Sequence, residues 1–100
     1  MDMMMDKTEF KGFEPDLKLK TAIGRTFEAI LGSAPSDSEP LARLQRTAEG
    51  FKGFLSLTSR QGIFVVEAVG REPLEMIGRL RDRMNEQIGS WRGGRRLKGY

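Results

Sequence analysis

The feature that most constrains the fold is a change of hydrophobic period between residues 51 and 92. Apolar and polar side chains roughly alternate over residues 51–59, and apolar residues dominate residues 63–69, so two strands are predicted. The link between them, Arg60-Gln61-Gly62, is short, and its glycine can adopt a left-handed conformation at little cost. We therefore predict an antiparallel hairpin with a three-residue loop.

The second predicted strand of this hairpin is apolar on both faces. Because side chains alternate along a strand, Phe64, Val66 and Ala68 are predicted to face the core, and Glu67 is predicted to face solvent. An apolar strip beside Glu67 on an open sheet face is a candidate contact for a protein partner or a homodimer. Alternatively, a terminal segment folds over it. The members of this strip are Ile63, Val65 and Val69.

From Pro73 onward the hydrophobic period becomes that of a helix. Apolar side chains recur at steps of three and four residues, which predicts one stripe facing the core, with Arg79 and Arg83 on the opposite side. Proline is favourable in a first helical turn, and the pair Gly93-Gly94 is predicted to end the helix. The predicted stripe consists of Ile77, Leu80, Met84, Ile88 and Trp91.

The first half of the chain supplies the remaining elements. Residues 8–13 are predicted to form a short strand, and residues 15–31 a helix that Glu14 or Asp16 can cap. Residues 41–48 fit either a helix or an amphipathic strand, and we favour the strand because a hairpin needs a third strand for stability. The apolar stripe of the first helix consists of Leu19, Ile23, Phe27, Ile30 and Leu31.

The predicted order of elements is therefore β-α-β-β-β-α. This order corresponds to an α+β fold, a two-layer sandwich in which two helices cover one face of a four-stranded sheet. A chain of 100 residues suits a single domain with one modest core. We expect residues 8–92 to be folded, and residues 1–7 and 93–100 to be flexible tails.

The composition argues against catalysis. The chain contains no cysteine and no histidine, so thiolate nucleophiles, disulfides, the commonest metal ligand and the usual general base are all missing. Acidic pairs fall only at termini, in loops or at a helix start, so no catalytic residues, no metal site and no cofactor are predicted. No apolar run is long enough to span a membrane, and the opening MDMMMDK does not resemble a signal peptide. A non-enzymatic cytoplasmic protein is expected.

Positive charge is concentrated at the C-terminal end. The formal net charge is +3, with 17 basic and 14 acidic residues, and four of the basic residues lie within the last ten positions. Without those four, 13 basic residues stand against 14 acidic ones, a net charge of −1. Such a tail indicates either a polyanionic partner or a solvated terminus. Its start, RGGRR, is similar to the RGG boxes of nucleic-acid-binding tails. The four residues are Arg92, Arg95, Arg96 and Lys98.

The segment EAVGREPLEMIGRL, followed one residue later by DRMNEQIGSWR, carries a resemblance to a known family. It resembles the ribosome hibernation promoting factors and ribosome-associated inhibitors, also called sigma factor modulation proteins, in their short form. Upstream, FKGFEPDLKLKTAIGRTFEAIL is similar to the first strand and helix of that family. The residues that match the family's last helix, identically or conservatively, are Asp82, Arg83, Met84, Gln87, Ile88, Trp91 and Arg92.

This resemblance implies a role in translation regulation under stress. Short members of the family occupy the small ribosomal subunit where mRNA and tRNA would bind, and they contact ribosomal RNA through basic residues. Glu86, Gly89 and Ser90 depart from the pattern, since family members often carry Arg or Lys there. A divergent member that binds a protein instead is the alternative. The RNA contacts implied for this chain are Lys18, Lys20, Arg25, Arg79, Arg83 and Arg92, with Arg95, Arg96 and Lys98 in the tail.

Overall fold

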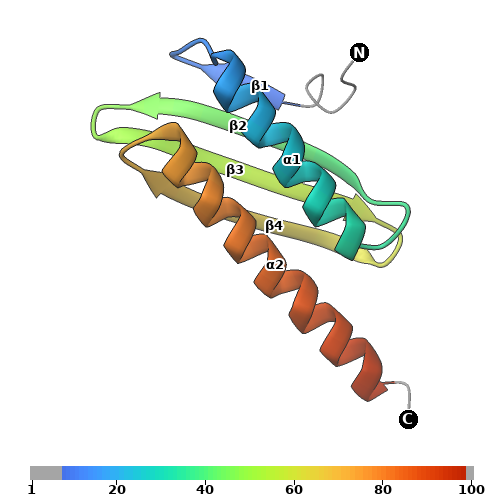
Figure 1. Cartoon of the computed structure of the whole chain (residues 1–100). Helices are drawn as coiled ribbons and strands as arrows, with labels where there is room; N and C mark the ends of the chain where they lie inside the picture. The colour runs from blue at the N-terminus through green and yellow to red at the C-terminus, as the bar shows by residue number, and fades with distance from the viewer. Residues whose placement is uncertain (1–7, 99–100) are drawn as a thin grey trace.

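The computed structural model describes the backbone of residues 8–98 and the side chains of residues 8–92. Its strands form one sheet in the order β1-β2-β3-β4, with β1 parallel to β2 and the other pairs antiparallel. Both helices lie on the same face of the sheet and run in the same direction (Figure 1). The predicted α+β sandwich is confirmed. The elements are β1 (Thr8–Lys11), α1 (Leu17–Ser33), β2 (Glu39–Thr47), β3 (Gly50–Ser59), β4 (Gly62–Gly70) and α2 (Pro73–Lys98).

Strand β4 has the two faces that its alternation predicted. Its core-facing side chains are at most 8% exposed, whereas Ile63, Val65 and Val69 are 67%, 41% and 58% exposed on the open face. The helices cover only one face of the sheet, so the other face keeps its apolar strip towards solvent. The buried face of the sheet consists of Ala42, Leu44, Leu55, Leu57, Phe64, Val66 and Ala68.

The ambiguous segment before the hairpin is a strand. Residues 39–47 pair with β3 along their whole length, and Phe10 of β1 lies opposite Leu44 on the other side. Alternation places Ala42 and Leu44 in the core while Arg43 and Gln45 are exposed. Pairing on both sides therefore selects the strand over the helix.

The β3–β4 hairpin is tighter than predicted. Arg60 and Gln61 alone connect the strands, and Gly62 is the first residue of β4, so the three-residue loop was wrong. Gly62 has a φ of 138°, a value that side-chain-bearing residues rarely adopt. The Ser59 hydroxyl accepts a hydrogen bond from the Gln61 N–H at 3.1 Å and donates to the Gly62 carbonyl at 3.0 Å. These local bonds close the turn.

Helix α1 begins directly after its capping residue, Asp16. The Asp16 carboxylate accepts a hydrogen bond from the Leu19 N–H at 2.8 Å, which satisfies one of the free donors of the first turn. Pro15 lies before this cap, so the predicted start was two residues early. The predicted stripe is confirmed, with four members buried and Leu31 packed at the core's edge.

Helix α2 packs unusually close to the sheet at its first turn. Its predicted stripe is confirmed, and Met76, which the prediction did not include, is fully buried beside it. A Cβ atom placed at Gly70 would lie 2.8 Å from the Met76 backbone nitrogen, and one at Gly53 would overlap the Met76 sulfur. These two glycines therefore leave the hollow that Met76 fills.

The C-terminal part of α2 differs from the prediction. The helix continues through Gly93 and Gly94 to Lys98, so the prediction that the glycine pair ends it was wrong. Glycine lowers helix propensity by about 1 kcal/mol but does not force a stop. Figure 1 shows this end of α2 extending past the sheet. The predictions for residues 1–7, and for the side chains of Arg95, Arg96 and Lys98, lie outside the described residues.

Over residues 8–98, neither helix combines the length and the apolar character needed to cross a membrane.

Candidate nucleic-acid interface

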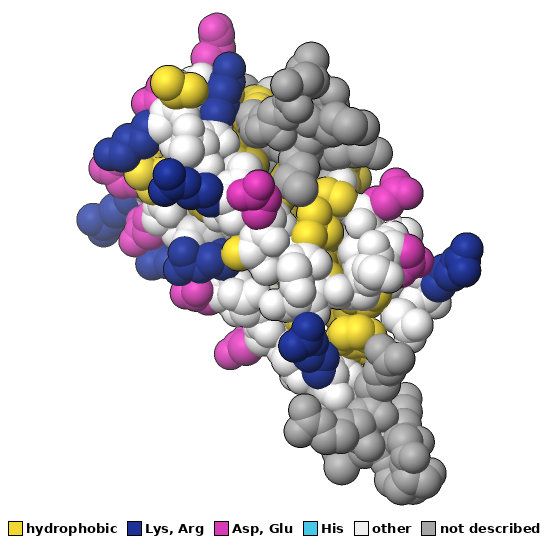
Figure 2. Space-filling view, turned by 45° about the vertical axis from the view of Figure 1, so that its right-hand side comes forward, with side chains coloured by type: hydrophobic (Ala, Val, Ile, Leu, Met, Phe, Trp, Pro, Cys, Tyr) yellow, Lys and Arg dark blue, Asp and Glu magenta, His cyan; other side chains and the backbone are white. Residues whose placement is uncertain are grey.

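The predicted RNA-contacting residues of α1 are all exposed. Lys18 and Arg25 are about two helical turns apart and share one face, whereas Lys20 lies on another side of the helix. None of the three forms an ion pair with another described residue. In the view of Figure 2, Lys and Arg side chains are interspersed with Asp and Glu side chains rather than gathered in one patch. The fold thus offers separated cations on this side.

A groove of about 670 Å³ separates the two helices. Lys18 and Arg25 border it from α1, and Arg81 borders it from α2. Sequence reasoning missed Arg81. The available signal was its spacing from Leu74, about two turns earlier on the same helix face, with Ile77 between them. We call this feature the interhelical groove. Its lining residues are Leu17, Lys18, Thr21, Ala22, Arg25, Thr26, Leu74, Ile77 and Arg81.

The arginines predicted on the outer face of α2 instead contact the sheet. Three α2 side chains, each four residues after the last, donate hydrogen bonds to backbone carbonyls on the outer edge of β4. Four helical residues advance about 6 Å, and two strand residues advance about 6.6 Å, so each donor meets the next carbonyl. We call these side chains the edge ladder. Its pairs are Arg79 with Val69 (2.7 Å), Arg83 with Glu67, and Gln87 with Val65 (2.9 Å).

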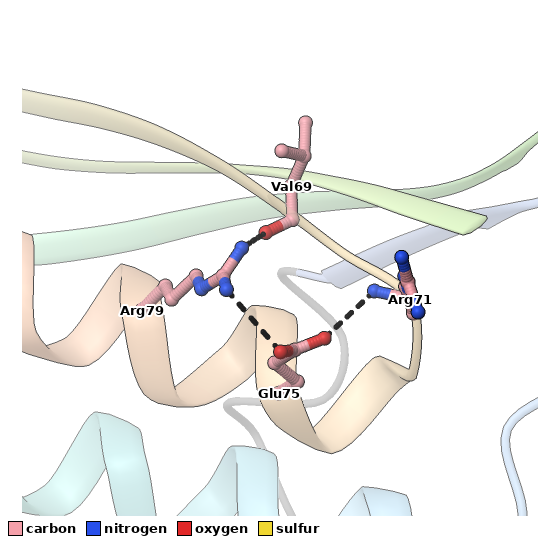
Figure 3. A network of polar contacts seen from close by, with 4 residues as sticks. All are labelled: Val69, Arg71, Glu75 and Arg79. Atoms are coloured by element: carbon pink, nitrogen blue, oxygen red, sulfur yellow. Dashed lines mark hydrogen bonds and ion pairs between the residues drawn. The ribbon is translucent and has the colours of Figure 1, made fainter. Parts of the chain in front are cut away.

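Glu75 holds the side chain of Arg79, the first member of the edge ladder (Figure 3). Its carboxylate accepts the Arg71 N–H at 2.8 Å and pairs with the Arg79 guanidinium at 3.2 Å. The hydrogen bond from the Arg71 backbone, followed by the positive charge of Arg79, lowers the pKa of Glu75 below its usual value of 4.5. Arg79 is therefore held by two partners and has part of its charge compensated.

Of the remaining predicted residues, Arg92 alone has a described side chain, and it does not join these groups. Arg92 is exposed near the end of α2, one residue after Trp91, whose ring packs edge-on against Phe64 at 5.9 Å. On the open sheet face, Arg43 pairs with Glu9 at 3.3 Å and lies over the ring of Phe54. Within the described part of the chain, no group of His, Cys, Asp or Glu side chains could hold a metal ion.

No protein-family model matches the sequence, and no curated protein matches it in sequence. The fold has a counterpart among solved structures. The N-terminal domain of Protein Y from Thermus thermophilus has a similar fold. The two superpose with a TM-score of 0.65, over 81% of this chain and 91% of that one, at 16% sequence identity. Likeness at so low an identity establishes a shared fold alone.

Proposed function

We propose that this chain is a non-catalytic, ribosome-associated RNA-binding protein of the hibernation-factor type, acting in the cytoplasm on RNA of the small ribosomal subunit. One observation carries the proposal. The segment that resembles this family, residues 67–92, forms the end of β4 and most of α2, and the same fold occurs in the N-terminal domain of Protein Y. Because one fold can serve many functions, this support needs a direct test.

The described cations differ in how available they are for phosphates. Lys18, Lys20 and Arg25 are exposed and form no ion pair with a described residue. In contrast, Arg79 and Arg83 donate to carbonyls of β4. A guanidinium that already satisfies a strand edge gains less from a phosphate than a fully solvated ammonium. We therefore expect α1 to supply more of the salt-dependent affinity than the edge ladder.

Sedimentation with purified small ribosomal subunits tests the proposal. At low salt the chain should travel with the subunit, and binding should weaken steeply as salt rises, because phosphate contacts release counterions. Replacing Lys18, Lys20 and Arg25 with Gln should flatten the slope of log affinity against log salt by up to about 2–3 units, at 0.7–0.9 per contact.

The matched control removes the same charge elsewhere. Lys11, Lys52 and Arg60 are exposed and belong to strands or turns rather than to α1, so their replacement with Gln should change the slope far less. A chain that stays at the top of the gradient at low and moderate salt, and does not bind RNA, would refute the proposed function.

A second function, as a protein-interaction module or a homodimer, is favoured by one observation. The open sheet face exposes Ile63 and Val69 to 67% and 58%, and large exposed aliphatic side chains on one strand are typical of an interface. Light scattering over a range of concentrations tests the homodimer. A mass that rises with concentration, and falls back in an Ile63→Asp variant, would support it. A constant monomer mass would leave only a different protein as partner for that face.

A further inference from the structure

The interhelical groove is bordered by two exposed leucines that are not part of the hydrophobic core. Leu17 is 79% exposed and Leu74 is 41% exposed, one at the start of each helix. Between them the groove is lined by Ile77 and Thr26, which are at most 9% exposed. Because α1 and α2 run in the same direction (Figure 1), the two leucines flank the same end of the groove. The groove therefore has an apolar floor and an apolar entrance.

The charged side chains that line this groove are all basic. Lys18, Arg25 and Arg81 line it, and no acidic side chain does. The positive ends of both helix dipoles lie at the leucine end. Asp82 pairs with Arg81 at 3.2 Å and compensates part of its charge, so Lys18 and Arg25 are the lining cations without a described ion pair. The Asp16 carboxylate caps α1. An occupant should consequently combine aliphatic and acidic groups.

Single-stranded RNA is a poor match for this combination. Proteins that bind unpaired RNA commonly stack its bases on aromatic side chains, and none of the residues lining the groove is aromatic. Phosphates would engage the three cations but leave Leu17 and Leu74 in water. A protein segment with aliphatic and carboxylate side chains would satisfy both.

We propose that the interhelical groove binds a short amphipathic helix of a partner protein, with aliphatic residues on one face and Asp or Glu beside them. The stretch of α1 from Leu17 to Thr26 spans about 13 Å, enough for two to three turns of a helix. Helix-in-groove recognition of this kind uses aliphatic anchors at i, i+3 or i+4, and i+7. This site goes beyond the proposed function, and because it shares Lys18 and Arg25 with it, RNA and the helix should compete.

The test uses a fluorescent synthetic helix of about four turns, with leucines at i, i+3 and i+7 and glutamates flanking them. Amide signals of Ala22, Thr26 and Ile77 should shift on its addition to the full chain. The variant Leu17→Ser/Leu74→Ser, which keeps the charge, should bind it at least about tenfold more weakly, because burial of two aliphatic side chains is lost. The control variant Ile63→Ser/Val69→Ser, on the open sheet face, should bind the synthetic helix normally. The variant Lys18→Gln/Arg25→Gln should bind the helix more weakly.

Single-stranded oligouridine of matched length, measured with the same variants, separates this site from the RNA function. The double serine variant should keep its RNA affinity, whereas Lys18→Gln/Arg25→Gln should weaken both ligands. Unchanged peptide affinity in the serine variant would overturn the proposal. Groove amide signals that shift with RNA but not with the peptide would also overturn it. Groove signals that move on simple dilution would show that a second copy fills the groove, which would also overturn it. Failure of ribosome binding alone would leave the peptide site intact.

Discussion

Glu75 shows how one exposed carboxylate can contribute stability. It joins the Arg71 backbone after β4 to the Arg79 guanidinium on α2, and its pKa is lowered in the folded chain. A lowered folded pKa means that the stabilisation is present above the unfolded pKa and is lost as pH falls through the folded pKa. We expect Glu75→Gln to unfold at lower urea than the wild type at pH 7, with the gap closing in acid below the usual value of 4.5.

The control for this measurement is Glu86→Gln, which removes one negative charge from the same helix at an exposed position. A pH 7 deficit in Glu75→Gln no larger than that of Glu86→Gln would contradict the role given to Glu75. A deficit that persists unchanged in acid would do the same.

Gly70 is required for the close approach of α2. A Cβ atom there would lie 2.8 Å from the Met76 nitrogen and 3.1 Å from its Cα, and backbone atoms cannot move aside by changing rotamer. Gly70→Ala should therefore lower the free energy of unfolding by about 1–3 kcal/mol, as overpacking does. Gly89 lies within α2, and a Cβ atom there would have no atom within 4 Å. Gly89→Ala should therefore stabilise the protein by about 1 kcal/mol. Urea unfolding measures both, and equal effects of the same sign would contradict this account.

At the scale of elements, α2 covers an edge as well as a face. Strand β4 ends the sheet, and an unpaired strand edge invites association with another chain. The edge ladder occupies three successive outward carbonyls of β4. Replacing Arg79, Arg83 and Gln87 with Ala should free this edge, so that the apparent mass in light scattering rises with protein concentration.

Another triple variant on the same helix provides the comparison. Arg81, Asn85 and Arg92 are exposed α2 residues outside the edge ladder, and their replacement with Ala removes a similar amount of charge and side chain. This control should remain at the wild-type mass. Equal behaviour of the two triples would indicate that lost charge, rather than the freed edge, governs association.

The sequence predicted those features that depend on one element at a time. Alternation in β4 and the stripe of α2 gave the correct inward faces. It could not predict the edge ladder, which depends on β4 being the last strand and on its register with α2. Met76 fits the helical spacing, since it lies four residues before Leu80, but the space that it fills is left by Gly53 and Gly70 of other elements. The interhelical groove likewise requires the two helices to be placed side by side.

At the scale of the whole molecule, α2 has its described core contacts up to Trp91, and the positive charge of the C-terminal segment follows that residue. Residues 1–90 carry a net charge of −1 and the last ten residues carry four cations, while Trp91 still packs on Phe64. We expect deletion of residues 95–100 to leave the urea midpoint nearly unchanged, because the described contacts of α2 with the core lie before this segment. The same deletion should flatten the salt dependence of binding to ribosomal RNA by up to about 2–3 units.

A second variant separates charge from helix length in this prediction. Arg95, Arg96 and Lys98 replaced with Gln keep the chain length but remove the same three charges. If the cations act through phosphates, this variant should reproduce the flattened slope of the deletion, because counterion release depends on charge and not on chain length. A deletion that flattens the slope while the Gln variant does not would assign the effect to the helical backbone. An unchanged slope in both would restrict the RNA contacts to α1 and the earlier part of α2, and would leave the C-terminal cations without a role in binding.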